Sequence, residues 1–245
     1  MSSSTYTRYE LLRAFRNGRF FVFSLGFPLI LFFLIAGPNR HVHSLGGSGI
    51  PAPLYFMVAL AAFGTMNSVM SAGARISVER LAGWNRQLRL TPLRPRVYFR
   101  TKVLTAYLLA LVTIVALYAS GVLLGVRLSA DTWLEMTGLL VVGLIPFAAL
   151  GIAMGHLLST DTIGPAMGGT TALLGFFGGV WFPITGSGPM HAVAESLPSY
   201  WLVQASHVGI GGAAWGALGW AVVAAWSVGA ALAAAAAYRR DRARP

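Results

Sequence analysis

The sequence alternates between six long apolar runs and short polar segments. The runs cover Phe20–Gly37, Pro53–Ala74, Val103–Val126, Met136–Leu158, Ile163–Phe182 and Ala213–Tyr238. Because a helix of about 20 apolar residues crosses a hydrocarbon core of about 30 Å, each run is long enough to span a membrane. The runs are continuous rather than alternating in polarity, which favours helices over barrel strands. The pattern predicts an all-α polytopic membrane protein with six transmembrane helices in one domain, residues 1–245.

The composition agrees with a membrane protein. Hydrophobic residues make up 56% of the chain and charged residues 10%, whereas soluble domains carry about 25% charged residues. The chain has no cysteine, which excludes disulfides and thiolate chemistry. Its net charge of +11 would suggest nucleic-acid binding in a soluble protein. Here the basic residues flank the apolar runs, so membrane topology explains them and we expect no nucleic-acid partner.

The basic residues predict the orientation of the chain. Sixteen of the 18 lie in the amino-terminal segment, in the second connection between runs, or in the carboxy-terminal tail. The other two are Arg40 and Arg127, in the first and third connections. Because basic residues accumulate in cytoplasmic loops, both termini are predicted to be cytoplasmic.

The second connection, residues 75–102, combines charge with helical periodicity. It holds eight basic residues against one acid, Glu79. Three apolar residues are spaced to share one face of a helix: Leu81, Trp84 and Leu88. Pro92 and Pro95 would end that helix. The segment therefore predicts a short amphipathic helix in the cytoplasm that docks on a partner.

The amino-terminal segment, residues 1–19, has a similar pattern. As a helix it would place Leu11, Leu12, Ala14 and Phe15 on one face, and Glu10, Arg13, Arg16 and Asn17 on the other. Such a helix lies in the plane of the lipid headgroups. A plain basic flank that only sets topology explains the same residues equally well.

The fifth connection, residues 183–212, is the longest segment predicted to lie outside. It is too apolar for a solvated loop, and glycines and prolines interrupt it too often for a span. We expect two short re-entrant helices that dip into the outer leaflet, covered by protein or facing a water-filled cavity.

Few residues offer chemistry of their own. The chain has no GxxxxGK[ST] phosphate-binding loop, and ionisable residues are nearly absent from the runs, which argues against ion-coupled transport. His41 and His43 lack further ligands nearby, so we assign no metal and no catalytic residue. His191 and Glu195 are expected to form a surface pair, and His156 to make a structural hydrogen bond between helices.

Two motifs resemble the permease subunits of ABC-2-type (type V) ABC exporters. The first runs from Glu79-Arg80 through Gly83-Trp84 and Arg86-Gln-Leu-Arg-Leu-Thr-Pro-Leu93 to Tyr98 and Lys102. It is similar to a small bacterial subgroup linked to drug and antimicrobial export. The second is Gly178-Gly-Val-Trp-Phe-Pro183, followed by Pro198. The resemblance covers essentially the whole chain.

The resemblance implies a transport subunit, not an enzyme, in a bacterial inner membrane. A separate ATPase subunit, in two copies, would bind ATP and Mg, so we expect no cofactor in this chain. The residues expected to couple the chain to that ATPase are Glu79, Arg80, Gly83, Trp84, Arg86 and Leu88. The motif expected at the outer side comprises Gly178, Gly179, Pro183 and Pro198.

Two permease chains, identical or different, would pair through spans one and five and enclose a substrate path. Candidate lining residues are Phe23, Phe27, Phe63, Met66, Asn67, Met167, Phe176, Phe177 and Trp181. An apolar lining suits the export of a hydrophobic or amphipathic substrate, such as a drug, an antimicrobial or a lipid-like molecule. One alternative stays open: a membrane scaffold or sensor without transport, whose basic insert recruits a cytosolic protein.

Overall fold

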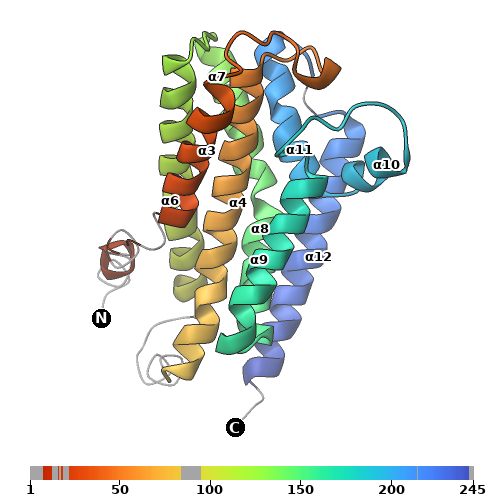
Figure 1. Ribbon diagram of the computed structural model, residues 1–245. Coiled ribbons are helices and arrows are strands. Elements are labelled where there is room, and N and C mark those ends of the chain that lie inside the picture. The colour runs from red at the N-terminus through yellow and green to blue at the C-terminus, as the bar shows by residue number, and fades with distance from the viewer. Residues whose placement is uncertain are drawn as a thin grey trace.

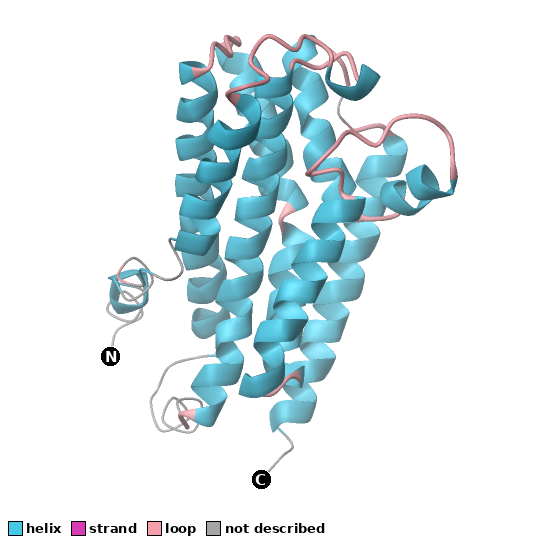
Figure 2. Ribbon diagram, in the orientation of Figure 1, coloured by secondary structure: helices cyan, strands magenta, loops and turns pink. Residues whose placement is uncertain are grey.

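The computed structural model describes residues 8–12, 16, 18, 22–83, 95–213 and 215–242. All regular structure in these ranges is helical, as Figure 2 shows. The longer helices run side by side as one bundle (Figure 1). They are α3 (Phe27–Ala36), α4 (Ala52–Leu81), α6 (Pro95–Leu123), α7 (Ala130–Gly143), α8 (Ile145–Leu157), α9 (Thr160–Phe177) and α12 (Ala217–Arg242).

Helix α4 forms the centre of the bundle and is buried along most of its length. Its closest neighbour is α8, and glycines make that approach possible. A Cβ atom on Gly73 of α4 would lie 2.4 Å from the backbone of Gly151 in α8, and one on Gly155 would lie 2.4 Å from the carbonyl oxygen of Gly73. Glycine pairs of this kind bring helix backbones together in membrane proteins. Helices α4 and α8 therefore pack backbone against backbone.

Within the described residues, four helical stretches are long and apolar enough to cross a membrane: Ala52–Leu81, Val97–Leu123, Ala130–Leu157 and Ala217–Asp241. They correspond to the second, third, fourth and sixth predicted runs. The first run contains a shorter apolar helix, Ser24–Ala36, and the fifth contains α9, whose first turn carries Asp161. The chain is an all-α membrane protein, and the count of six spans remains a prediction.

The helix boundaries depart from the apolar runs in two places. Helix α4 continues past Ala74 to Leu81, and α6 begins at Pro95, before Val103. Both extensions carry polar side chains that are buried, so hydropathy alone ended α4 too early and started α6 too late. The fourth run is divided into α7 and α8 at Leu144, where Pro146 supplies no backbone N–H to continue the first helix.

The connection between α9 and α12 contains two short helices, as the sequence predicts. They are α10 (Pro189–Glu195) and α11 (Pro198–Gln204), and a 3₁₀ turn, Ala205–Ile210, follows them. Helix α11 is buried over most of its residues, whereas α10 is mostly exposed. Figure 1 shows both beside the upper part of the bundle rather than above it. Their depth in a membrane remains a prediction.

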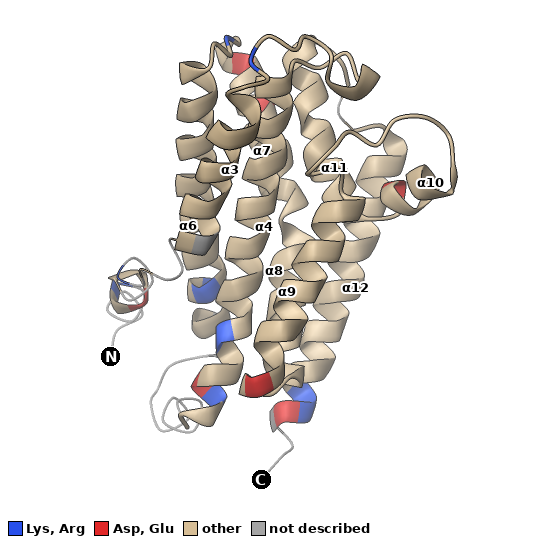
Figure 3. Ribbon diagram, in the orientation of Figure 1, with Lys and Arg blue, Asp and Glu red and all other residues tan. Residues whose placement is uncertain are grey.

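Charge divides the bundle into two ends. Figure 3 shows Lys and Arg gathered toward the lower end, where α4 ends, α6 begins and α12 ends. We call this the basic end, and the end that holds α10 and α11 the opposite end. At the α8–α9 junction of the basic end, Ser159 caps α9 in a reciprocal capping box with Thr162. Asp161 lies two residues further along, in the first turn of α9.

Candidate coupling site at the basic end

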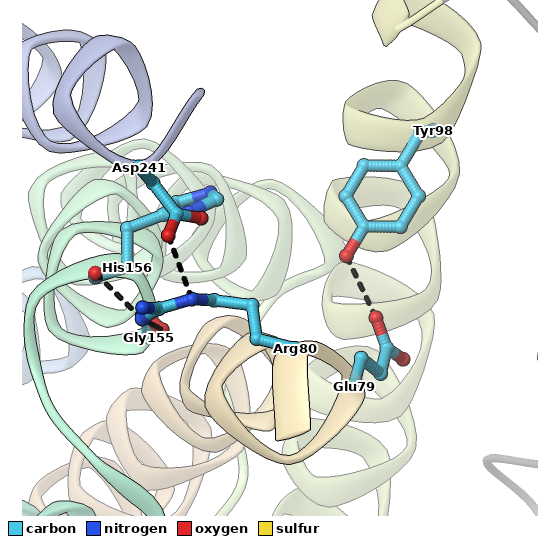
Figure 4. Close-up of polar contacts among 6 residues, drawn as sticks. All are labelled: Glu79, Arg80, Tyr98, Gly155, His156 and Asp241. Atoms are coloured by element: carbon cyan, nitrogen blue, oxygen red, sulfur yellow. Dashed lines mark hydrogen bonds and ion pairs between the residues drawn. The ribbon is translucent and has the colours of Figure 1, made fainter. Parts of the chain in front are cut away.

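The last turn of α4 presents two adjacent charged residues to different neighbours. Glu79 points toward Tyr98 of α6, and Arg80 points toward α8 and α12 (Figure 4). Consecutive positions on a helix are separated by about 100°, so they face different packing partners. These two residues begin two polar clusters, which join the end of α4 to different parts of the chain.

The first cluster centres on Lys102 of α6, the only lysine of the chain. Its Nζ atom is 2.5 Å from Glu10 Oε1 in the amino-terminal segment, and it also contacts Glu79 Oε1. The Tyr98 hydroxyl donates a hydrogen bond to Glu79 Oε2 at 2.7 Å. We call Glu10, Glu79, Tyr98 and Lys102 the lysine cluster.

The charged side chains of the lysine cluster are buried. The side chains of Lys102 and Glu79 are each 4% exposed, and that of Glu10 is 9% exposed. Buried charges are tolerated when each has a partner of opposite charge, and removal of one partner typically costs about 3–5 kcal/mol. The cluster therefore holds α4, α6 and the amino-terminal segment in one fixed arrangement.

This geometry changes the interpretation of the amino-terminal segment. The sequence placed Glu10 on the polar face together with the arginines, but Glu10 is buried against Lys102. Leu12, expected on the apolar face, is exposed. Most of residues 1–19 lie outside the described residues, so the predicted interfacial helix can be placed only through residues 8–12, which are helical.

The second cluster joins Arg80 to the carboxy-terminal helix. Arg80 Nε is 2.9 Å from Asp241 Oδ1, and His156 Nδ1 is 2.9 Å from Asp241 Oδ2. A terminal nitrogen of Arg80 also donates to the carbonyl oxygens of Gly155 and His156, at 3.3 and 2.7 Å. These carbonyls lie in the last turn of α8, where backbone acceptors lack helical donors. We call Arg80, His156 and Asp241 the arginine clasp.

Aromatic rings surround the imidazole of the clasp. The ring centroids of Phe99 and Tyr238 lie 6.1 and 5.4 Å from that of His156. Phe99 and Tyr238 also pack edge to face, at 5.1 Å. The structural role expected for His156 is confirmed, because a hydrogen bond between its Nδ1 atom and Asp241 Oδ2 joins α8 to α12.

We call residues 75–102 the basic insert. Both clusters lie at its two ends, in the last turns of α4 and the first turns of α6, which we call its roots. Helix α4 ends at Leu81, and Gly83 follows with a left-handed φ of 67°. Leu81 is thus the last residue of α4, and the amphipathic helix predicted for Leu81, Trp84 and Leu88 stays a prediction. Trp84, Arg86 and Leu88 lie outside the described residues. The described residues of the site, Glu79 and Arg80, tie the insert's first root to α6, α8 and α12.

The predicted path residues separate into two groups. Phe27, Phe63, Phe176 and Trp181 line one apolar groove of about 480 Å³ between α3, α4 and α9. The ring centroids of Phe27 and Phe63 are 6.4 Å apart, and those of Phe63 and Trp181 are 5.5 Å apart. We call this the aromatic groove.

The remaining path residues do not line the groove. Met66 and Met167 are buried in the core of the bundle, and Asn67 and Phe177 are partly exposed. The side chain of Phe23 lies outside the described part of the chain. Burial in the core indicates that the two methionines pack helices together.

The outer motif gathers where α9 ends. Gly178 caps α9, and a Cβ atom there would lie 2.9 Å from Ser199 of α11. Gly179 has a left-handed φ of 76°, and its carbonyl oxygen accepts a hydrogen bond from the Tyr55 hydroxyl. Pro198 begins α11. The motif therefore forms a tight turn that joins α9, α4 and α11.

The comparisons with known proteins agree with this arrangement. The family model for the ABC-2 type transporter matches residues 3–210. This chain belongs to the ABC-2 type transporter family. It is also 27% identical over 199 residues to a protein of Bacillus subtilis (strain 168) named "Putative transport permease YvfS", and the match covers 78% of each chain.

Membership in the ABC-2 family fixes the general role of the chain. It is a multi-pass membrane protein and a transport permease rather than an enzyme, and the family implies an ABC transporter assembly with an ATPase partner. The match spans both roots of the basic insert and the outer motif. The lysine cluster and most of the arginine clasp therefore lie in the part of the chain that the family model covers.

Sequence reasoning missed two of the seven residues of these clusters. Glu10 was placed only on the polar face of an amphipathic helix, and Asp241 was given no role, yet each joins a cluster around α4. The one available signal is that acidic residues are scarce, because the whole chain has only seven of them. An acid beside a basic, membrane-flanking segment is a candidate for a specific ion pair.

Proposed function

We propose that this chain is the permease subunit of an ATP-driven exporter, which moves a hydrophobic or amphipathic substrate out of the cell. A separate ATPase subunit, present in two copies, holds ATP and Mg and supplies the energy. The observation that carries this proposal is the lysine cluster, because it ties both roots of the basic insert to each other and to the amino-terminal segment.

The proposed coupling follows from where the cluster lies. Glu79 precedes the insert in α4, and Lys102 follows it in α6. A force applied to the insert by a closing ATPase therefore reaches two helices that an ion pair holds together. The arginine clasp passes the same displacement from Arg80 to α8 and α12. Such transmission needs two packed arrangements whose balance the ATPase shifts.

The proposed orientation places the basic end in the cytoplasm of a bacterium. Basic segments are retained on that side, and the described basic residues near the end of α4, the start of α6 and the end of α12 share one end of the bundle (Figure 3). In this arrangement α3 and α9 complete a set of six spans, and α10 and α11 dip into the outer leaflet. The ATPase would then reach the insert through Trp84, Arg86 and Leu88.

The aromatic groove is the proposed substrate path. Phe27, Leu173 and Phe176 of its lining are exposed on α3 and α9, so a second permease chain that packs along these helices would enclose it. Its walls carry aromatic and aliphatic side chains with Thr171 among them. Such a lining suits a drug, an antimicrobial or a lipid-like molecule better than an ion or a sugar alone.

The first test is assembly with the cognate ABC ATPase. We expect the detergent-solubilised chain to co-purify with that ATPase, and the complex in lipid nanodiscs to hydrolyse ATP faster when an amphipathic drug is added. If a folded chain binds no ATPase, the exporter proposal fails, and the scaffold interpretation accounts for the basic insert better.

A matched pair of variants tests the coupling step. Glu79→Gln keeps the size of the side chain but removes its charge from the lysine cluster, whereas Glu195→Gln removes the charge of the partly exposed pair with His191 at the opposite end. We expect the Glu79 variant to bind the ATPase but to lose most drug-stimulated hydrolysis, and the Glu195 variant to behave as wild type. Equal stimulation in both variants contradicts the proposed coupling.

A further inference from the structure

A second cavity lies at the opposite end of the bundle and is lined in part by the outer motif. Its volume is about 260 Å³. It is walled by the loop before α4, by the start of α4, by the turn after α9, and by α11 with the 3₁₀ turn that follows. The polar side chains of its lining are Ser48, Tyr55, Thr185, Tyr200, Gln204 and His207. We call this cavity the outer pocket.

The lining of the outer pocket contains no aspartate, glutamate, lysine or arginine. Its polar groups are hydroxyls, one amide and one imidazole, and a hydroxyl or an amide can both donate and accept hydrogen bonds. A charged ligand buried there would lack an opposite charge, which is costly. The chemistry therefore matches an uncharged ligand that has several hydroxyl groups.

Two buried tyrosines, Tyr55 and Tyr200, line the pocket. The Tyr55 hydroxyl is oriented by its hydrogen bond to the carbonyl oxygen of Gly179. Burial raises the pKa of the Tyr200 phenol, an effect that the Glu195 carboxylate adds to and a hydrogen bond with Gln204 opposes. Tyr200 therefore stays a neutral hydroxyl, and both rings offer flat apolar faces beside their polar atoms.

Two glycines, Gly47 and Gly186, line the edge of the pocket, which we call its rim. Gly47 and Gly186 both have left-handed φ angles, of 78° and 91°, and a Cβ atom on either would meet nothing within 4 Å. The backbone of the rim is thus exposed to a ligand without covering side chains. Pockets that bind small molecules are usually preformed in this manner.

The outer pocket and the aromatic groove share one turn. Gly178, Gly179 and Pro183 line the pocket, and Phe176 and Trp181 of the same segment line the groove. Neighbouring residues of one turn thus line two cavities of different chemistry, one polar and uncharged and one apolar, as the two parts of an amphiphile differ.

We infer that the outer pocket is a binding site for an uncharged, hydroxyl-rich group such as a sugar. The sugar arrives either free or as the head of a glycosylated amphiphile whose tail lies in the aromatic groove. The second source, a glycosylated amphiphile, would be the exported substrate and so rests on the proposed function. Binding of a sugar in the pocket does not depend on transport.

Binding to the chain alone, in phosphatidylcholine nanodiscs without ATPase, tests this inference by saturation-transfer NMR. The probes are methyl β-D-glucoside, hexyl β-D-glucoside and hexylphosphocholine, which keeps the tail but carries a zwitterionic head without hydroxyl groups. We expect the glucosides to bind and the hexyl compound to bind more tightly. If methyl and hexyl β-D-glucoside bind equally tightly, the tail adds nothing and the ligand of the pocket is a free sugar. Hexylphosphocholine binding as tightly as hexyl glucoside overturns the inference.

Two variants connect the binding to the pocket. Gln204→Leu and Thr185→Val each remove hydrogen-bonding groups with little change of size, and Thr185 is exposed, so its variant should fold if the first does not. Each should weaken glucoside binding about fivefold to tenfold, since one hydrogen bond is at stake. Ser187→Ala, beside the rim but outside the lining, is the control. Unchanged affinity in both pocket variants overturns the inference, and because no ATPase is present, that result leaves the exporter proposal standing.

Discussion

The two ends of the bundle hold their polar groups in different ways. At the basic end, the lysine cluster and the arginine clasp pair opposite charges across four segments of the chain. At the opposite end, the groups around the outer pocket are uncharged and face a cavity. Buried ion pairs tolerate little rearrangement, because each separation exposes an unpaired charge. This difference fits the two proposed roles, in which the basic end transmits displacement and the opposite end receives a ligand.

The largest expected effect is at the centre of the lysine cluster. Lys102→Met keeps the length of the side chain but leaves Glu10 and Glu79 buried without their cation. We expect the free energy of unfolding to fall by about 3–5 kcal/mol, measured by thermal unfolding in nanodiscs and by the yield of folded protein.

A triple variant separates stability from coupling. Replacing Glu10 and Glu79 by glutamine together with Lys102→Met removes all three charges, so no unpaired charge remains buried. We expect most of the lost stability to return, while drug-stimulated ATP hydrolysis stays low. A single Lys102→Met protein as stable as wild type would show that the lysine cluster is not a tight ion-paired unit.

A smaller effect is expected at the turn of the opposite end. In Gly178→Ala the new methyl group would lie 2.5 Å from the carbonyl oxygen of Leu174 and 2.9 Å from Ser199. Overpacking of this kind costs about 1–3 kcal/mol. Gly188→Ala adds a methyl group that meets nothing within 4 Å, so it should leave the melting temperature unchanged. If both variants melt alike, α11 does not pack against the α9 turn as described.

The smallest effect is expected in the arginine clasp. Asp241→Asn keeps the shape of the side chain but removes the charge that faces Arg80 and His156. Because the Asp241 side chain is 16% exposed and that of Arg80 is 23% exposed, water screens this pair, and we expect a loss of about 1 kcal/mol.

Coupling should respond to the same change more than stability does. The Asp241 variant should show a partial loss of drug-stimulated hydrolysis, whereas Arg240→Gln, in the same tail but exposed, should behave as wild type. A full wild-type response of the Asp241 variant would remove the clasp from the transmission route and leave the lysine cluster as the route that remains.

The sequence predicted the helices well because their apolar runs are long and continuous. It also singled out Glu79 and Arg80, through a motif. It could not pair them, because Glu10, Lys102 and Asp241 are distant along the chain and meet only after the helices pack. Hydropathy also ended α4 at Ala74, since it treats Glu79 as a residue that must leave the bundle.

At the opposite end the sequence signal was weaker. The glycine- and proline-rich motif predicted short helices, and α10 and α11 are there. It did not indicate a polar cavity, because the lining comes from three separate stretches of the chain and its polar side chains are ordinary hydroxyls, an amide and an imidazole. The contact of Gly73 with α8 was missed for a related reason, since a close approach needs both helices in place.

The most direct test of the account is the ratio of substrate molecules exported to ATP molecules hydrolysed, in proteoliposomes that contain the permease and its ATPase. The account predicts that Glu79→Gln lowers this ratio severalfold or more, while the complex stays assembled and Glu195→Gln keeps the wild-type ratio. If the Glu79 variant exports as much substrate per ATP as wild type, the lysine cluster does not couple the ATPase to the membrane helices.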